Sequence, residues 1–257
     1  MEHDYITSLV ENNSRIDGRS FDEYRKIIIE TNVSKNASGS ARCKIGDTEV
    51  IVGVKMDVGE PYPDSPDEGS IIIGAELLPL SSPEFELGPP GTQATELARI
   101  VDRGIRESRA VDFKKLCIKE GEKCWLLFID IYTINDDGNL IDASALAALA
   151  ALNGARFNKL SGHDYKINYN EHSNEKIKLE LLPITCTFGK INGKIIIDPN
   201  SKEERVLDAR LSISTGNGKI YAMQKGGDKG FIIEEIEHAI DIAIEKEKEL
   251  KRLIKLV

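Results

Sequence analysis

Residues 40–58 read SARCKIGDTEVIVGVKMDV, and this stretch decides the class of fold. Four apolar residues alternate with their neighbours after the Gly46-Asp47 turn: Val50, Val52, Val54 and Met56. Alternation with a period of two is typical of a half-buried strand, so the stretch predicts two antiparallel strands, 40–45 and 48–58. An isoleucine-rich strand is expected before them, over 24–33. The folded part of the chain therefore begins with an antiparallel meander.

Strands and helices succeed each other along the rest of the chain. Further strands are expected over 70–80, 113–119, 124–135, 179–191, 194–198, 206–214 and 219–224. Helices are expected over 96–109, with Thr92 or Thr95 as the N-cap, over an alanine-rich 143–159 capped by Asp142, and from Phe231 to the end, with Ile232 on its buried side. Elements in this order favour an α+β fold with mixed sheets and packed helices.

A polar segment divides the predicted elements into two groups. Residues 161–175 are expected to form a loop, and the composition changes again at Lys178. We therefore predict two lobes, 17–162 and 178–257. A helix or polar arm over residues 1–16 precedes them.

The predicted helix over 96–109 has two different faces. At about 100° per residue, one face carries Leu97, Ile100, Val101, Gly104, Ile105 and Ser108, and the other carries Arg99, Arg103, Arg106 and Arg109. In one interpretation the arginines form a solvated surface with local ion pairs, such as Asp102 with Arg106 at i,i+4. In the other they bind an anion, because the planar guanidinium fork suits phosphates. The helix alone leaves both interpretations open.

The overall charge limits how such a face can be used. The chain has 257 residues, 40% of them hydrophobic, and a formal net charge of -9. It is long enough to bury a substantial core. A free-standing nucleic-acid-binding protein is usually basic, because it gains from counterion release. If the arginine face binds nucleic acid, we therefore expect it to do so beside a more basic partner.

Composition also bears on the compartment and on metal or cofactor binding. The longest apolar run, 145–152, is far short of the roughly 20 residues of a membrane helix, and the N-terminus is polar, so we expect a cytoplasmic protein without membrane contact. Cys43, Cys117, Cys124 and Cys186 lack zinc-ligand spacing and are expected to be reduced and mostly buried. Acids near the proline-rich 59–69 loop allow a divalent-ion site, but a solvated loop is favoured. No cofactor or metal is expected.

Five motifs, taken in order, are similar to those of one family. They are Asp17-Gly18-Arg19, Tyr24-Arg25, Ser38-Gly39-Ser40-Ala41, Gly46-Asp47-Thr48-Glu49-Val50-Ile51 and the segment 96–106. In order and spacing the chain resembles the RNase PH family of phosphorolytic exoribonucleases from about residue 17 to 255. Within it, the chain is most similar to the non-catalytic RNase PH-like ring subunits of the archaeal exosome. The resemblance implies an RNase PH-like (ribosomal protein S5 domain 2-like) two-lobed fold.

The resemblance also implies where phosphorolytic chemistry would lie. Active members attack the terminal 3′ phosphodiester of RNA with phosphate held by a Gly-Ser/Thr-Arg-type segment before the alanine-rich helix. The corresponding positions are Asn139, Leu140 and Ile141, followed by Asp142, so phosphate is not expected to bind. Two second-lobe aspartates six residues apart correspond to Glu203-Glu204 and Asp208 at a shorter interval. Surface acids near Lys202, Arg205 and Arg210 explain these carboxylates equally well.

The leading hypothesis is therefore a subunit with no catalytic residue and no metal site. The resemblance implies that it alternates with a catalytic RNase PH-like sister subunit in a hetero-hexameric ring, a trimer of heterodimers that carries RNA-binding cap proteins. It would shape the sister's active site and contact single-stranded RNA through Arg99, Arg103 and Arg106. Two alternatives stay open. The chain is itself a phosphorolytic or hydrolytic exoribonuclease that uses Glu204 and Asp208, or it is purely structural and its arginines form salt bridges.

Overall fold

The structure is a computed structural model that describes residues 2–162 and 165–256. Its helices are α1 (Glu2–Glu11), α2 (Thr92–Glu107), α3 (Leu140–Gly154), α4 (Ser201–Glu204) and α5 (Ile233–Lys255), with a 3₁₀ turn η1 (Phe113–Leu116). Its strands are β1 (Ile27–Thr31), β2 (Gly39–Ile45), β3 (Thr48–Gly59), β4 (Ser70–Glu76), β5 (Cys117–Lys119), β6 (Lys123–Asn135), β7 (Arg156–Ser161), β8 (Lys166–Lys176), β9 (Ile184–Ile191), β10 (Lys194–Ile197), β11 (Ala209–Gly216) and β12 (Lys219–Gly226). The predicted α+β class with mixed sheets is confirmed.

The larger sheet contains the predicted meander. Its strand order is β1-β2-β3-β6-β4, with β5 paired to β6. All neighbours are antiparallel except β4 and β6, which run parallel. The alternating residues of β3 from Val50 to Met56 are fully buried, as the period of two predicted. Their neighbours on the other face of β3 stay partly or fully exposed.

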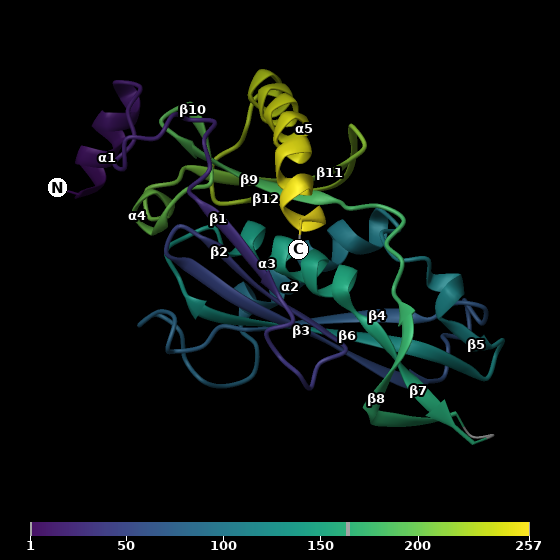
Figure 1. Ribbon diagram of the computed structural model, residues 1–257. Helices are drawn as coiled ribbons and strands as arrows, with labels where there is room; N and C mark the ends of the chain where they lie inside the picture. The colour runs from purple at the N-terminus through teal and green to yellow at the C-terminus, as the bar shows by residue number, and fades with distance from the viewer. Residues whose placement is uncertain (1, 163–164, 257) are drawn as a thin grey trace.

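The smaller sheet lies on the other side of two helices. It is antiparallel throughout, in the order β10-β9-β11-β12. In Figure 1, α2 and α3 lie between the two sheets and α5 lies against the smaller one. The two faces of β9 differ accordingly, since Thr187 bonds to Asp142 of α3 while Lys190 pairs with Glu235 of α5 at 2.7 Å. α1 packs apart from these layers, beside β10 and α4.

Helix α3 is buried on all sides. Every residue from Ile141 to Leu152 is buried, and the helix contacts strands of both sheets. Its alanines allow close approach, as predicted. A Cβ atom on Gly39 of β2 would lie only 2.3 Å from the carbonyl oxygen of Ala151, so this strand position accepts glycine alone without a shift of backbone.

Two predicted boundaries around α3 are wrong. The helix begins at Leu140, where the cap is Asn139 rather than Asp142, and it ends at Gly154 rather than 159. Strand β7 follows directly, and apart from residues 163–164, which lie outside the described residues, most of the expected 161–175 loop belongs to β8. The hairpin is held by ladder hydrogen bonds and by a few apolar contacts such as Phe157 with Trp125. The strands of this hairpin are polar, so they lack the apolar alternation from which strands are predicted in a sequence.

Smaller differences have similar local causes. The strand expected over 113–119 begins as a 3₁₀ turn, because the Asp112 side chain accepts a hydrogen bond from the Lys114 backbone. The N-cap of α2 is Gly91, without a side-chain cap, rather than Thr92 or Thr95. Ile232 is not on the buried side of α5; it is the N-cap residue and 58% exposed.

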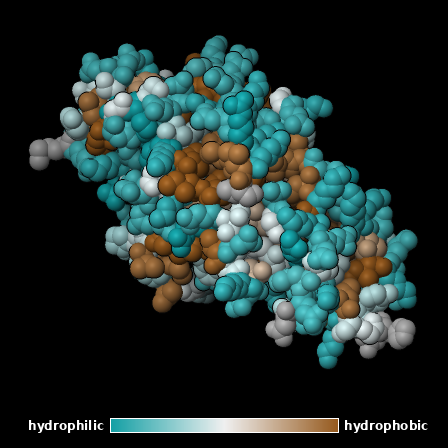
Figure 2. All heavy atoms as spheres, in the orientation of Figure 1, coloured by the Kyte–Doolittle hydropathy of each residue, from teal (hydrophilic) through white to brown (hydrophobic). Residues whose placement is uncertain are grey.

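On the face shown in Figure 2 most of the surface is hydrophilic, and apolar residues gather in separate patches. None of the described helices combines the length and apolarity needed to cross a membrane. The four cysteines are free, and three of them are buried. In the 59–69 loop, Asp67 pairs with Lys114 at 2.9 Å. Over residues 2–162 and 165–256, no group of three or more His, Cys, Asp or Glu side chains is placed to hold a metal ion.

Candidate functional site

Helix α2 presents its two predicted faces to different surroundings. Leu97, Ile100, Val101 and Ile105 are buried in the main core. Arg99 is exposed, whereas Arg103 and Arg106 are half-buried. Arg109 lies beyond the end of the helix with a φ of 50°, so it leaves the arginine face. Three arginines therefore remain on this face of the helix, and their surroundings differ.

Arg106 has several partners within the chain. Its guanidinium donates to both carboxylate oxygens of Asp102, at 2.8 and 3.1 Å, and to the carbonyl oxygen of Ile71 at 2.9 Å. It also lies over the ring of Phe113. The i,i+4 pair that the sequence allowed is present, and the interpretation as a local ion pair fits this arginine.

Arg99 and Arg103 lie beside an open hollow of about 670 Å³. The other residues around it are Pro90, Gly91, Thr92, Thr95, Glu96 and Gln224. Arg103 donates to the amide oxygen of Gln224 on β12. Neither arginine forms an ion pair with any residue that the structure describes. Two uncompensated guanidinium groups at one hollow can hold an anion such as a phosphodiester.

A glycine brings this helix close to the smaller sheet. A Cβ atom on Gly104 would lie 3.1 Å from the Ser214 hydroxyl oxygen and 3.5 Å from that of Thr185. A larger residue would push α2 away from β9 and β11. The close approach places Arg103 within reach of β12, at the edge of the sheet.

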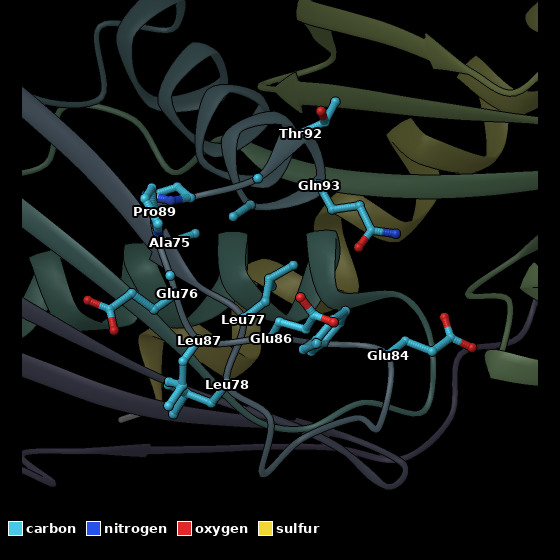
Figure 3. A pocket seen from close by; sticks show the side chains of 15 residues that line it. Ala75, Glu76, Leu77, Leu78, Glu84, Glu86, Leu87, Pro89, Thr92 and Gln93 are labelled. Carbon is cyan, nitrogen blue, oxygen red and sulfur yellow. The ribbon is translucent and has the colours of Figure 1, made fainter.

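A second hollow, of about 570 Å³, lies on the other side of the start of α2 (Figure 3). The loop before α2 closes it, and its side chains include the carboxylates of Glu76, Glu84 and Glu86 together with several leucines. None of its lining residues is cationic. This hollow is therefore unsuited to an anion, and the arginine hollow is the candidate for phosphate contact.

Carboxylates surround Asn139, the first residue of the segment 139–141 in which the resemblance led us to expect no phosphate binding. Asn139 is buried in a left-handed conformation with a φ of 59°. Its backbone N–H donates to Glu204 at 2.8 Å, and its side-chain amide donates to Asp142 at 3.0 Å and to Asp198 at 2.7 Å. The donors of Asn139 are thus already paired with three carboxylates.

Asp142 is fully buried at the start of α3. Its carboxylate accepts hydrogen bonds from the Tyr24 hydroxyl at 2.7 Å and from the hydroxyl and backbone N–H of Thr187 at 2.7 and 2.9 Å. Burial raises the pKa of Asp142 to about 6, although these hydrogen bonds oppose the shift. The Asp142 carboxylate therefore already has three hydrogen-bond donors from Tyr24 and Thr187.

Arginines of the N-terminal motifs are paired with buried carboxylates as well. The Asp198 carboxylate accepts from Arg19 at 2.9 Å and from Arg25 at 2.8 and 2.9 Å. Arg15 and Glu203 form an ion pair of 2.6 Å in which both side chains are completely buried. We call Arg15, Arg19, Arg25, Asp198 and Glu203 the buried ion cluster. Each of its three arginines pairs with a carboxylate of the cluster, and Arg19 and Arg25 pair in addition with Asp17 and Asp137.

The prediction that Glu203 and Glu204 are surface acids is wrong. Glu203 belongs to the buried ion cluster, and Glu204 is half-buried against the Asn139 backbone. Burial raises the pKa of Glu204 to about 7. Asp208 faces elsewhere, since it pairs with Lys229 at 2.7 Å and accepts from the Asn192 backbone at 2.9 Å. Among the described residues, the side chains of Glu204 and Asp208 share no hydrogen-bond partner.

Nearby cations also pair differently from what the sequence suggested. Arg210 donates to Glu96 of α2 at 2.7 Å, Arg205 lies 3.7 Å from Glu84, and Lys202 lies 3.9 Å from Glu2. None of them neutralises Glu203 or Glu204. The two acids considered for catalysis therefore have separate partners: Glu204 contacts the Asn139 backbone, and Asp208 pairs with Lys229.

Two residues at these sites were missed in the sequence. Asp198 ends a run of three isoleucines and precedes a proline, so an acid at a strand end was a usable signal. Gln224 gave none, because it stands in a strand with ordinary polar alternation and meets Arg103 across 121 positions of sequence. Only the packing of α2 against the smaller sheet brings them together.

Comparison with known proteins agrees with this fold. Residues 23–158 match the RNase PH model described as "3′ exoribonuclease family, domain 1", and residues 182–246 match domain 2. The proteins named exosome complex component Rrp42 from Methanothermobacter thermautotrophicus and Archaeoglobus fulgidus are each 47% identical to the chain. The alignments cover 95% and 99% of this chain, and 91% and 96% of the relatives.

A solved structure described as the Archaeoglobus fulgidus exosome with RNA bound to the active site contains a chain with the same fold. It superposes with a TM-score of 0.90 at 46% identity, and covers 98% of this chain and 96% of its own. The resemblance inferred from the five motifs is confirmed. On these matches, the chain belongs to the RNase PH (3′ exoribonuclease) family.

Proposed function

We propose that this chain is a non-catalytic ring subunit of an archaeal-type exosome, a phosphorolytic complex that degrades RNA from the 3′ end. It alternates with a catalytic RNase PH-like sister subunit in a trimer of heterodimers that carries RNA-binding cap proteins, in the cytoplasm. It shapes the sister's active site and contacts single-stranded RNA through Arg99 and Arg103, with Arg106 in a supporting position.

One observation carries the non-catalytic assignment. At the positions where active relatives hold phosphate, the donors of Asn139 are paired with Asp142, Asp198 and Glu204. The nearest arginines of the N-terminal motifs, Arg19 and Arg25, are bonded to Asp198. A phosphate entering here would meet three carboxylates and no uncompensated cation among the described residues. Phosphorolysis needs the opposite arrangement, with cations at the oxyanions.

Measuring phosphate-dependent RNA shortening tests this assignment. The purified chain is expected to release no nucleoside diphosphate from a 3′-labelled single-stranded RNA in inorganic phosphate. The chain mixed with its catalytic sister subunit is expected to release it. Robust activity of the isolated chain would support the enzyme alternative, in which case Glu204→Gln and Asp208→Asn should each abolish it.

The surface of α2 favours RNA contact over a purely structural role. Arg106 pairs with Asp102 and behaves as a structural residue. Arg99 and Arg103 keep their charge at an open hollow, where a phosphodiester can reach them. In a chain of net charge -9, a second, more basic subunit would supply the remaining attraction for RNA.

Charge reversal in the assembled ring tests RNA contact. The double variant Arg99→Glu/Arg103→Glu is expected to weaken binding of single-stranded RNA about tenfold or more at low salt, because two phosphate contacts become repulsive. Lys248→Glu/Arg252→Glu on α5 changes the formal charge equally and serves as the control. Equal affinities of both variants and the unmodified ring at low salt would exclude this contact.

A further inference from the structure

We infer that Gln224 of β12 is a positioning residue for RNA contact: it fixes the guanidinium of Arg103 toward the hollow without neutralising its charge. The inference rests on the proposed function and extends the RNA-contact surface from α2 to the edge of the smaller sheet. Gln224 lies outside the arginine helix, in a strand whose polar alternation does not distinguish it from its neighbours.

The chemistry of the partner is the first argument. Arg103 donates to the amide oxygen of Gln224, and its guanidinium keeps four further N–H donors. A neutral amide leaves the full positive charge available to a phosphate. Arg106, three residues further along the same helix, has a carboxylate partner instead and its charge is compensated. The two neighbouring arginines thus differ in what they can still attract.

The orientation of the amide is the second argument. The Gln224 side-chain N–H₂ donates to the carbonyl oxygen of Lys225 at 3.3 Å, which leaves the amide oxygen for Arg103. Gln224 stands opposite Ser212 of β11, and β12 has no further strand on its outer side. A regular ladder therefore holds the glutamine backbone, while its side chain reaches the rim of the hollow.

The packing beneath Arg103 is the third argument. A small hollow of about 10 Å³ lies beside Arg103, and Ile100, Ser214 and Ala222 are among the residues that line it. This volume is far too small to hold a guanidinium, so the Arg103 head group cannot enter it. Arg103 and its partner Gln224 both border the larger hollow, which they share with Arg99. A fixed guanidinium loses less conformational entropy when it binds a phosphate.

The test compares two substitutions of Gln224 in the ring assembled with its catalytic sister subunit. RNA affinity is measured with a short single-stranded RNA over a series of salt concentrations. Gln224→Glu creates a carboxylate partner for Arg103 and should weaken binding about tenfold, with the slope of log K against log salt reduced by about 0.7, the loss of one phosphate contact. Gln224→Ala leaves the charge and removes only the anchor, so a loss of about threefold with an unchanged slope is expected.

Two controls separate positioning from general charge or folding effects. Gln93 is an exposed residue of α2 that borders the hollow shown in Figure 3. Gln93→Glu introduces the same charge as Gln224→Glu and should leave the slope of log K against log salt unchanged. In an Arg103→Ala background, Gln224→Glu should cause a much smaller loss than in the unmodified ring. Unchanged midpoints of thermal unfolding confirm that both Gln224 variants are folded.

The outcomes decide between the inference and the function on which it rests. If Arg99→Glu/Arg103→Glu weakens binding but Gln224→Glu leaves affinity and slope as they are, the role of Gln224 is overturned and the proposed function stands. An equal loss from Gln224→Glu with and without Arg103 also overturns it. If the arginine double variant binds RNA normally, the proposed RNA contact itself fails.

Discussion

Two groups of arginines in this chain have opposite surroundings. In the buried ion cluster, Arg15, Arg19 and Arg25 bond to Glu203 and Asp198, whose side chains are fully buried. On α2, Arg99 and Arg103 border an open hollow and have no carboxylate partner among the described residues. The residue type is the same, but one group is compensated and the other is available to an external anion.

The difference shows that an arginine count does not by itself indicate a binding site. A buried guanidinium is stable only with a carboxylate and full hydrogen bonding, so its charge is compensated inside the fold and is not available to a ligand. A surface guanidinium whose partner is a neutral amide, or which has no partner, has an uncompensated charge that can attract a ligand. Arg106 is intermediate, since it lies on the binding helix but has a carboxylate partner.

Breaking the buried ion cluster should have the largest effect. Glu203→Ala leaves Arg15 buried without its carboxylate, and the free energy of unfolding should fall by about 3–5 kcal/mol. Chemical denaturation of the purified chain measures this loss. The exposed pair of Arg205 with Glu84 is the control, and Arg205→Ala should change the free energy of unfolding by less than about 1 kcal/mol. A loss that small for Glu203→Ala would contradict the comparison.

The carboxylates around Asn139 should make stability depend on pH. Burial raises the pKa of Glu204 to about 7 and that of Asp142 to about 6, so the folded chain binds these protons more tightly than the unfolded chain. Their contribution is present at low pH and is lost as pH rises through these values. Glu204→Gln removes the larger shift and keeps an oxygen for the Asn139 N–H. It should therefore match the unmodified chain near pH 4, below the ordinary pKa of a glutamate, and be more stable by on the order of 2 kcal/mol at pH 8.

Denaturation of both proteins across that pH range checks the sign. Parallel curves for Glu204→Gln and the unmodified chain would show that Glu204 is ionised in the folded state without penalty.

The smallest effect should separate two arginines of the same helix. Arg106→Ala removes the Asp102 pair, the bond to Ile71 and the contact with Phe113, and should lower the free energy of unfolding by about 1 kcal/mol. Arg99→Ala should change it by less than about 0.5 kcal/mol, yet weaken RNA binding by the ring more than Arg106→Ala does. Equal stabilities of the two variants would remove the distinction between a structural and a ligand-binding arginine on α2.

Local patterns predicted much of this fold. The alternation in 48–58 and the two faces of 96–109 carry their own burial signal, and the structure confirms both. The β7–β8 hairpin was missed because its strands are polar and pair mainly through the backbone. At the candidate site, helical spacing predicted that Arg99 and Arg103 share one face of α2, and both border the same hollow. The burial of Glu203 was not predicted, because its partner Arg15 lies 188 residues earlier in the chain.

Helix α3 has a consequence for how the chain unfolds. Because it packs against strands of both sheets and is buried from Ile141 to Leu152, the two sheets share one main core. A cut between the segments matched by the two family domains would expose a strongly apolar helix surface to water. Neither half is then expected to fold alone, and synthesis of the chain must pass residue 191, the end of β9, before α3 can contact the smaller sheet.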